Sequence, residues 1–464
     1  MMVHSLKQLF SVFDHSVSTD DLQKYGQDWS GVLTPNASLV VFPKSTKEVS
    51  QILKLCTEHK IAVVPSGGRT GLSGGAVAAN GEVVLSLEKL SFIKNINTQS
   101  FTVEVGAGAI TQAVHEFCET HGLTWPVDFA SKGSSTVGGN ISTNAGGVRV
   151  IRYGNTRYWV LGLTVVLMSG EVLQINGALE KNNSGYDLRH AFIGTEGTLG
   201  VVTEAVLKLT PVKNNLSKVV FFKLKDFEAL IRLFQKTRLN NNITINAFEC
   251  LTFECLQKVV QHSGRSPFSQ IDDGKMYALL EMECTDEVAE AYFNQVLDST
   301  ELNSTEVINA VMAQNAKEKQ ELWAYRENVA EAVMHQSQVY QHDLSVPVKN
   351  LSNYLKEIQN FYATQYPDFS PYIFGHIGDG NLHVFIQKPQ TLTIEEFKSK
   401  CQQSDHQLFS ITQKWGGSVS AEHGIGLLKK HALGFVKENQ EIEALKKLKK
   451  IFDPNNLLNP GKIF

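Results

Sequence analysis

Three histidines and one glutamate stand beside glycine-rich turns near the C-terminal end of the chain. His376 and His383 flank the turn in FGHIGDGNLHVFI, and Glu422 and His423 are adjacent in VSAEHGIG. The first stretch predicts two short strands around GDG, so its two imidazoles are expected to converge. Two imidazoles and a carboxylate with open coordination positions can present a catalytic divalent metal to a substrate. Hairpin histidines can also be merely hydrogen-bonded, so the residue types alone leave the metal open.

Other candidate segments are rich in glycine instead of titratable side chains. PSGGRTGLSGGA, residues 65–76, follows the strand-like IAVV and contains five glycines. Such a loop can point several backbone N–H groups into one concavity that suits phosphate oxygens. It matches neither the Walker pattern GxxxxGK[ST] nor the Rossmann pattern GxGxxG. Taken alone, it could be a glycine-rich turn without a ligand.

Two further loops have the same character. One covers residues 125–154, WPVDFASKGSSTVGGNISTNAGGVRVIRYG, and the other covers residues 194–209, GTEGTLGVVTEAVLKL. Both are dense in small and hydroxyl-bearing residues. Three such loops in one region indicate a long polar ligand that carries phosphates, such as a dinucleotide.

Composition excludes several other classes of protein. The chain has 464 residues and a formal net charge of −4, and its Lys and Arg residues are dispersed, so no basic stripe indicates nucleic acid. The six cysteines form no CxxC motif, as expected of reduced thiols. The N-terminal stretch lacks a signal-peptide pattern, and no apolar run approaches the roughly 20 residues of a membrane helix. We therefore expect a cytoplasmic protein without a transmembrane segment.

The elements that position these loops change in character along the chain. Residues 38–212 alternate short β-branched runs with helical stretches such as STKEVSQILKLCTEHK. Beyond them, KDFEALIRLFQKTRL and VAEAYFNQVLDS predict amphipathic helices, and NAFECLTFEC and KMYALLEMEC contain strand-like stretches. This order predicts a sheet with helices on one face. A charged helix and the tail FDPNNLLNPGKIF close the chain.

Together the three loops resemble the FAD-binding domain of the vanillyl-alcohol-oxidase superfamily. Within that superfamily, they resemble the FAD-dependent D-2-hydroxyacid dehydrogenases, the branch of D-2-hydroxyglutarate and D-lactate dehydrogenases. The resemblance runs from about residue 35 to the final FDPNNLLNPGKIF. It implies an α+β fold: a two-subdomain FAD-binding domain over residues 1–213, with an N-terminal helical segment to about residue 35. A substrate- and metal-binding domain with a sheet covered by helices would span 214–430, and 431–464 would return to the FAD-binding domain.

The resemblance also implies which residues bind the cofactor. Those expected at the FAD diphosphate are Pro65, Ser66, Gly67, Gly68, Arg69, Thr70, Gly71 and Leu72. Those expected to line the cofactor further on are Asp128, Ser135, Gly138, Gly139, Asn140, Thr143 and Gly147. Glu196, Gly200 and Val202 are expected toward its adenosine and ribityl parts. Some relatives attach the flavin through a His in the first loop, where this chain has Arg69 and Thr70, so noncovalent FAD is expected.

For the histidines, the resemblance implies a metal centre. His376, His383 and Glu422 would bind zinc or another divalent metal, and His423 would take the hydroxyl proton of a D-2-hydroxy acid while hydride passes to the flavin. Arg326 in ELWAYRENVAEAV would bind the substrate carboxylate. Asn381 would either stabilise a left-handed turn or contact the substrate.

Three positions depart from the pattern of the relatives that oxidise D-2-hydroxyglutarate. Ala330, Gln341 and Phe385 stand where those relatives have Thr, Lys and Asn. The changes remove polar or charged groups that would recognise a second carboxylate, which is costly to desolvate without a partner. We therefore expect D-lactate or another monocarboxylic D-2-hydroxy acid to be preferred, with D-2-hydroxyglutarate as the alternative.

Two other classes of function stay open at this point. One is an FAD-dependent transferase of the lipid-ether synthase kind, and the other is a noncatalytic flavin- or metal-binding protein. The sequence has no motif for a second redox cofactor, so a dehydrogenase would need an external electron acceptor, either a quinone or an electron-transfer flavoprotein. It does not decide between a monomer and a homodimer, or whether the protein contacts a membrane peripherally.

Overall fold

The chain is divided between two units, and each unit is built from separate stretches of sequence. The structure, a computed structural model, describes residues 2–212, 217–271, 274–297 and 306–464. Unit 1 comprises Met1–Gly147, Tyr153–Val212 and Glu422–Phe464, and unit 2 comprises Val148–Arg152 and Lys213–Ala421. The domain boundary expected near residue 213 lies at the edge of 213–216, outside the described residues. Unit 2 also takes the short segment 148–152, which the sequence analysis had assigned to the FAD-binding domain.

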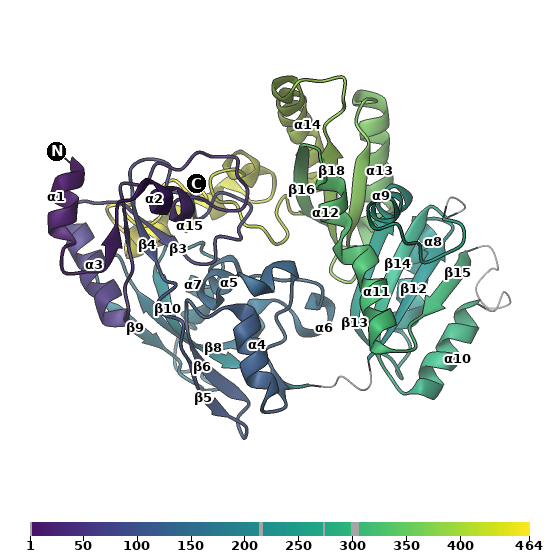
Figure 1. The fold of residues 1–464 in the computed structure, drawn as a ribbon, viewed down its shortest axis with the longest axis horizontal. Coiled ribbons are helices and arrows are strands. Elements are labelled where there is room, and N and C mark those ends of the chain that lie inside the picture. The colour runs from purple at the N-terminus through teal and green to yellow at the C-terminus, as the bar shows by residue number, and fades with distance from the viewer. Residues whose placement is uncertain (1, 213–216, 272–273, 298–305) are drawn as a thin grey trace. The chain divides into compact units, whose positions relative to one another are not determined.

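The first sheet of unit 1 has a parallel centre. Its order is β1-β2-β4-β3, and its strands are β1 (His15–Ser16), β2 (Leu39–Val41), β3 (Val63–Ser66) and β4 (Val83–Ser86). The helices around it are α1 (Met2–Leu9), α2 (Thr19–Tyr25) and α3 (Thr46–Glu58) (Figure 1). α3 begins as its sequence predicts, because the Ser45 side chain accepts a hydrogen bond from the Glu48 N–H and caps the helix.

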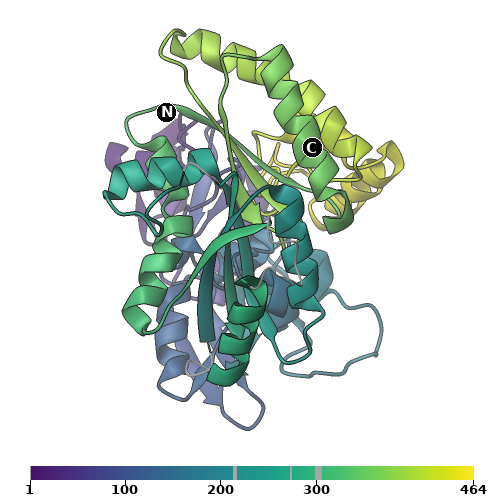
Figure 2. The ribbon, with the colours of Figure 1, turned by 90° about the vertical axis from the view of Figure 1, so that its right-hand side faces the viewer.

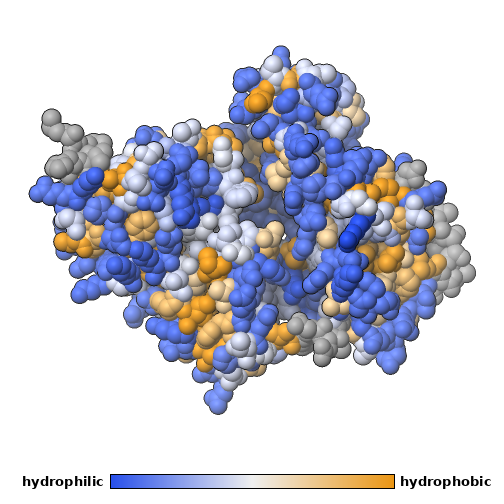
Figure 3. Space-filling view, in the orientation of Figure 1, coloured by the Kyte–Doolittle hydropathy of each residue, from blue (hydrophilic) through white to orange (hydrophobic). Residues whose placement is uncertain are grey.

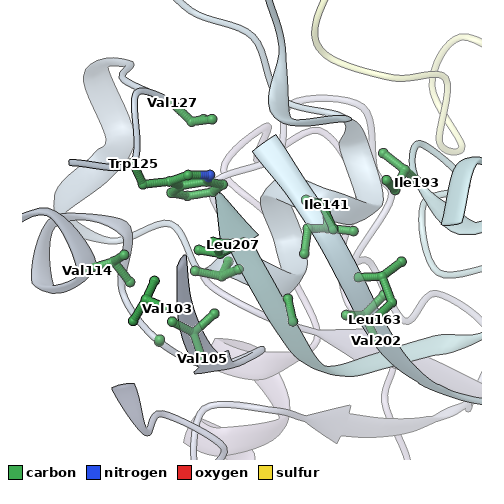
Figure 4. Close-up of a cluster of buried hydrophobic side chains, with 14 of the residues drawn as sticks. Val103, Val105, Val114, Trp125, Val127, Ile141, Leu163, Ile193, Val202 and Leu207 are labelled. Atoms are coloured by element: carbon green, nitrogen blue, oxygen red, sulfur yellow. The ribbon is translucent and has the colours of Figure 1, made fainter. Parts of the chain in front are cut away.

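The second sheet of unit 1 is antiparallel and encloses a core with α4 and α5. Its order is β5-β6-β10-β8-β9, from β5 (Ile93–Asn97), β6 (Thr102–Gly106), β8 (Val160–Val166), β9 (Val172–Ile175) and β10 (Val201–Lys208). Residues from this sheet, from α4 (Thr111–Glu119) and from α5 (Val137–Thr143) form one buried cluster, which includes Trp125 and Ile141 (Figure 4). The start of the second glycine-rich loop is therefore packed into a buried apolar cluster.

Shorter elements complete unit 1. They are β7 (Leu123–Thr124), η1 (Ala130–Gly133), α6 (Val150–Tyr153, shared with unit 2), η2 (Thr156–Trp159), α7 (Arg189–Phe192), β11 (Thr210–Pro211), η5 (Lys430–Phe435) and α15 (Asn439–Phe452). The C-terminal tail pairs with the first sheet, where Leu458 forms an isolated parallel β-bridge with Val63 of β3. The last residues of the chain therefore support the strand that leads into the first glycine-rich loop.

Unit 2 is built on one antiparallel sheet, whose strands differ in length. The order is β15-β12-β14-β13-β17-β18-β16. Its strands are β12 (Ser217–Leu224), β13 (Thr244–Thr252), β14 (Met276–Glu283), β15 (Val307–Met312), β16 (Val339–Ser345), β17 (Pro371–His376) and β18 (Asn381–Gln387). Its helices are α8 (Phe227–Arg238), α9 (Phe253–Ser263), α10 (Asp286–Leu297), α11 (Ala316–Glu327), α12 (Val329–Met334), η4 (Val348–Asn350), α13 (Leu351–Gln365) and α14 (Ile394–Lys414). The end of the predicted helix VAEAYFNQVLDS, residues 298–299, lies outside the described residues.

Helices cover both faces of this sheet, so the prediction of helices on one face was wrong (Figure 2). Leu251 of β13 packs with residues of α9, α11 and α12. Phe248 points the other way and stacks edge-on against Phe234 of α8, with ring centroids 5.0 Å apart. Because side chains alternate along a strand, a strand with apolar residues at both positions must be covered twice. The near-continuous apolar run of β13 already carried that signal.

The surface is ordinary for a folded chain of this composition. Hydrophilic residues dominate the face in Figure 3, and apolar residues form scattered patches. Within the described ranges, no helix is long and apolar enough to span a membrane. The cysteines all fall within those ranges, and each is buried with a free thiol.

Candidate functional site

The first and second glycine-rich loops of unit 1 lie directly against each other. A Cβ atom placed on Gly68 would overlap the Ser134 carbonyl oxygen, and one on Gly67 would lie 2.5 Å from Thr136 Oγ1. Among the described residues, the backbone N–H groups from Gly67 to Leu72 donate to no protein acceptor. Thr136 Oγ1 is likewise buried without a partner there. Donors that protein leaves unused, beside glycines that keep space open, fit a bound diphosphate.

Close approach, not backbone torsion, explains Gly67 and Gly68 of the first loop, since neither has a positive φ. Arg69, with φ 58°, and Gly74, with φ 80°, are left-handed residues of this loop. The Arg69 guanidinium donates to the Gly67 carbonyl at 2.8 Å and lies 4.6 Å from the centre of the Tyr25 ring. Glycine is needed here because the second loop occupies the space that a side chain would fill.

Most of the residues expected in the second loop brace the loop itself. Asn140 Nδ2 donates to Thr111 Oγ1 at 2.7 Å, and Ser135 Oγ shares a 2.8 Å hydrogen bond with the same hydroxyl. Gly138 packs against Ala107. The Thr143 hydroxyl donates to the Gly139 carbonyl at 3.1 Å. These contacts fix the loop backbone, so what remains to meet a cofactor is mainly the backbone.

The remaining second-loop positions lie at its two ends. Gly147 has φ 111°, and a Cβ there would overlap the Asp128 carbonyl oxygen. The Asp128 carboxylate accepts a hydrogen bond from Lys132 Nζ at 2.8 Å. The Gly147 N–H donates to Glu422 Oε1 at 2.7 Å. The loop therefore ends at the carboxylate that the sequence had placed among the metal ligands.

Glu196 is the centre of the third loop. Its carboxylate accepts hydrogen bonds from the backbone N–H groups of Ile425 and Gly426, each at 2.8 Å. Burial raises the pKa of this carboxyl above its usual range, and the two N–H donors oppose that shift. A Cβ on Gly200 would meet Val165, and Val202 pairs with Val165 in the sheet and has its side chain in the buried cluster.

In unit 2, His376 and His383 do converge. They lie on the paired strands β17 and β18, where His376 is opposite Asn381 and His383 is opposite Phe374. Their rings are 5.4 Å apart, centroid to centroid, and nearly perpendicular. Both side chains are largely buried.

Each of these imidazoles has a carboxylate beside its Nδ1 atom, which sequence reasoning missed. His376 Nδ1 lies 2.8 Å from Glu249 Oε1, and His383 Nδ1 lies 3.6 Å from Asp343 Oδ1. A carboxylate only accepts, so the His376 contact makes Nδ1 the donor and leaves the Nε2 lone pair for a metal. Carboxylate–histidine pairs of this kind orient metal ligands, so the donor set fits a divalent ion such as zinc.

Arg326 contacts Glu249, the carboxylate beside His376. Its NH2 atom lies 2.9 Å from Glu249 Oε2, an ion pair without hydrogen-bond alignment. The guanidinium lies 5.0 Å from the centre of the Phe374 ring, and its Nε is buried with no partner among the described residues. A buried guanidinium with an unused N–H can still bind an anionic ligand.

Of the three positions that depart from the relatives, Phe385 and Gln341 lie on the sheet face that carries Glu249, and Ala330 lies on α12. Phe385 is buried and packs edge-on against Phe374, with ring centroids 4.9 Å apart, and Ala330 packs against the same hydrophobic cluster. Gln341 pairs with Phe385 across β16 and β18, and its amide donates to Met334 Sδ at 3.3 Å.

Asn381 does not form the left-handed turn. Gly380 does, with φ 79°, and Asn381 begins β18. The Asn381 amide donates to Asp343 Oδ1 at 2.8 Å and to the Leu344 carbonyl at 2.9 Å. It therefore holds Asp343, the carboxylate beside His383.

Glu422 and His423 belong to unit 1 and directly follow the last residue of unit 2. That residue, Ala421, donates its N–H to the Asp343 carbonyl at 3.3 Å. Upstream of it, Ser418 exchanges backbone hydrogen bonds with Ser345 at the end of β16. The chain is thus anchored at the Asp343 edge of the sheet one residue before Glu422.

The segment 148–152 is a further connection that the sequence did not reveal. Arg149 lies 3.6 Å from Glu281, and Arg152 lies 2.6 Å from Glu283, both on β14. Ile151 fills the space beside Gly378 in the turn between the two histidines. This part of the second loop is therefore fixed to the sheet that carries His376 and His383.

Comparisons with known proteins show that the chain is an FAD-linked oxidoreductase. Residues 37–176 match the FAD binding domain family, and residues 213–463 match the family described as FAD linked oxidases, C-terminal domain. The chain belongs to this family of FAD-linked oxidases.

The similarity to known proteins extends over nearly the whole chain. D-2-hydroxyglutarate dehydrogenase of Xanthomonas citri pv. viticola is 43% identical over 99% of this chain and 96% of its own length. The enzyme of that name from Stutzerimonas stutzeri is also 43% identical, over 100% of this chain and 98% of its own. The Arabidopsis thaliana D-2-hydroxyglutarate dehydrogenase, mitochondrial, is 35% identical over 95% of this chain and 78% of its own. The resemblance to FAD-dependent D-2-hydroxyacid dehydrogenases is thereby confirmed.

Solved structures show the fold. A 4-ethylphenol oxidase from Gulosibacter chungangensis has a TM-score of 0.76 at 15% identity, covering 100% of this chain and 97% of its own. An alkyldihydroxyacetonephosphate synthase has a TM-score of 0.73 at 17% identity, covering 98% and 84%. At such identities the likeness concerns the fold alone, and it confirms the predicted α+β architecture of the vanillyl-alcohol-oxidase type.

Proposed function

We propose that this protein oxidises a D-2-hydroxy acid to the 2-oxo acid and passes the electrons from FAD to an external acceptor. The observation that carries the proposal is one sheet face of unit 2, where Glu249 joins Arg326 to His376, and the His376 ring converges with that of His383. A carboxylate receptor next to a two-imidazole metal site suits a substrate that has a carboxylate beside a hydroxyl.

His376, His383 and Glu422 are the proposed metal ligands. The orientation of the His376 ring by Glu249 supports this, since Nε2 is then the coordinating atom. The hydrogen bond from Ala421 to Asp343 supports it further, because it ties the chain to the edge of the histidine strands one residue before Glu422.

The protein's own residues would divide the remaining work. FAD, when bound, supplies the hydride acceptor, and the divalent metal supplies Lewis acidity toward the carboxylate and hydroxyl of the substrate. Arg326 would fix the substrate carboxylate, and His423 would take the hydroxyl proton as general base. Chelation and the Arg326 contact together would fix which face of C2 is turned to the acceptor, so L-enantiomers would react poorly.

The proposed substrate class is monocarboxylic, with D-lactate as its simplest member. Support comes from the buried, apolar packing of Phe385 and Ala330 near Arg326, which offers a second carboxylate neither a cation nor a hydrogen bond. D-2-hydroxyglutarate is the second candidate, favoured by the names of relatives at 43% identity over almost the full chain.

A substrate panel tests both parts of the proposal. Purified protein mixed anaerobically with D-2-hydroxy acids should lose its flavin absorbance, and kcat/KM for D-lactate should exceed that for D-2-hydroxyglutarate. A preference for D-2-hydroxyglutarate by an order of magnitude would overturn the monocarboxylate part and leave the dehydrogenase part standing. Flavin that no D-2-hydroxy acid bleaches would overturn the proposal, in favour of a transferase or a noncatalytic binding protein.

The three departing positions allow a sharper version of this test. The triple variant Ala330→Thr, Gln341→Lys, Phe385→Asn should shift preference toward the dicarboxylate, because the lysine can pair with the distal charge. Arg326→Ala should raise KM for both substrates. Noncovalent FAD, a quinone or flavoprotein acceptor, a homodimer, peripheral membrane contact and a cytoplasmic location stay predictions.

A further inference from the structure

Glu249 is a fully buried carboxylate in the middle of the candidate site. It lies on β13, directly opposite His376 of β17, and has no exposed surface. Its two oxygens serve different partners: Oε1 contacts His376 Nδ1 at 2.8 Å, and Oε2 contacts Arg326 NH2 at 2.9 Å. One side chain therefore touches both the proposed metal ligand and the proposed substrate receptor.

A buried carboxylate of this kind is costly unless its charge is compensated. Isolated charges inside a protein are strongly disfavoured, and those that persist are paired and hydrogen-bonded. Here the compensation comes from Arg326, whose guanidinium also lies over Phe374. The apolar surroundings confine both side chains, so the position of Arg326 depends on that of Glu249, and so does the ring orientation of His376.

We propose that Glu249 is a positioning residue that couples the metal ligand His376 to the substrate receptor Arg326. It orients the His376 ring through Nδ1, and it holds the guanidinium at a fixed distance from that ring. The inference rests on the proposed function and adds to it a residue that acts through its neighbours and does not touch the substrate.

Asp343, the carboxylate beside the second histidine, has different contacts. It lies 3.6 Å from His383 Nδ1 and accepts a hydrogen bond from the Asn381 amide. Glu249, in contrast, contacts both an imidazole and the Arg326 guanidinium.

Two substitutions distinguish the loss of these two contacts from a simple loss of stability. Glu249→Ala removes both oxygens. Glu249→Gln keeps the shape but has one acceptor and one donor, so it can serve His376 or Arg326 but not both. Asp405→Asn is the matched control: Asp405 is also a buried carboxylate of unit 2, but it bonds to the Tyr340 hydroxyl at 2.7 Å on the opposite face of the sheet.

The experiment measures Zn²⁺ affinity of the metal-stripped holo-flavoprotein by competition with a chromogenic chelator, without substrate, and then KM for D-lactate and D-2-hydroxyglutarate. Glu249→Ala should lower Zn²⁺ affinity by about 10–100-fold, the scale of losing an outer partner of a metal-binding histidine. It should also raise KM by about tenfold or more, because Arg326 loses its charged partner. Glu249→Gln should fall between, with one of the two quantities close to wild type.

The outcomes distinguish this inference from the function beneath it. If Glu249→Ala and Glu249→Gln match Asp405→Asn in Zn²⁺ affinity and KM, and differ from wild type only in melting temperature, Glu249 is merely structural and the inference is wrong. If the wild-type protein itself binds no Zn²⁺, the metal part of the proposed function fails and takes this inference with it. A loss of Zn²⁺ affinity with a parallel rise in KM supports the coupling.

Discussion

Unit 1 and unit 2 present their candidate sites in opposite ways. The loops of unit 1 offer mainly backbone: N–H groups from Gly67 to Leu72 that have no acceptor in the described part of the chain, beside glycines that lie against the second loop. The sheet face of unit 2 offers side chains, among them two imidazoles, a guanidinium and buried carboxylates.

This difference decides how each site tolerates change. A backbone site is indifferent to most side-chain chemistry and sensitive to volume, because an atom added at Gly67 or Gly68 meets the neighbouring loop. A side-chain site is sensitive to the identity of each group and to the register that aligns them. Substitutions can therefore break one site and spare the other, and the predictions below run from the largest expected effect to the smallest.

The largest loss is expected from the histidines of unit 2. His376→Ala and His383→Ala should each remove zinc and slow flavin reduction by about 10³-fold, since Lewis-acid stabilisation is worth several kcal/mol. FAD content should stay normal, because the loops of unit 1 are untouched. Elemental analysis and anaerobic stopped-flow absorbance check this, with His262→Ala on α9 as a control. Full activity in a variant that holds no metal would show that the metal has no catalytic role.

A smaller loss is expected at His423, which is proposed to move a proton and not to bind metal. His423→Asn should keep both zinc and FAD and slow flavin reduction by about 10²-fold, the scale of a lost general base. His431→Asn serves as the control, because His431 is an exposed histidine of the same C-terminal stretch of unit 1, Glu422–Phe464. If the rate of flavin reduction in His423→Asn equals that of the control, another group is the base.

The backbone site should respond to volume alone. Gly68→Ala should weaken FAD binding by about tenfold, because overpacking typically costs 1–3 kcal/mol. Gly434→Ala should be nearly silent, since Gly434 lies in η5, outside the cofactor loops, and a Cβ there meets nothing within 4 Å. Flavin released by dilution and read by fluorescence measures the difference. Equal retention in both variants would mean that the contact between the two loops does not shape the cofactor site.

The smallest effect concerns pH and the buried Lys462, whose Nζ donates to the Val77 carbonyl at 2.8 Å. Burial lowers the pKa of Lys462 from 10.5 to about 8. The unfolded chain then binds more protons than the folded one between these values, so the contribution of Lys462 to stability rises as pH increases through about 8. The melting temperature should gain a few degrees between pH 7 and 9.5 relative to Lys462→Met. Parallel profiles for the two proteins would contradict the shift.

The sequence predicted the parts whose signals are local. Ser45 marks the start of α3, the alternation around GDG gives β17 and β18, and glycine density marks the loops. Glu249 was invisible because its contact with His376 spans 127 residues and depends on which residues of β13 and β17 lie opposite each other. Strand register of this kind is set by the whole sheet, and no short motif records it.

Other misses have the same physical origin. Helix α9 went unassigned because its first residues continue the apolar run of β13, and only the length of each run distinguishes strand from helix. Residue 68 must be glycine because Ser134, from the second loop, occupies the space that a side chain would need. The fold class could be predicted, whereas the contacts across strands and loops required the structure.

The division of unit 1 between distant stretches bears on the order of events during synthesis. Asn459 donates to the carbonyls of Gly75 and Glu196, at 2.9 and 2.7 Å, and thereby joins the first loop to the third. These contacts cannot form until the ribosome has made all of unit 2. Although N-terminal domains usually fold first during translation, unit 1 must wait for its last residues. Flavin capture therefore becomes a late step in the life of each new chain, and a nascent chain arrested before residue 459 would expose an incomplete cradle to the cell's proteases.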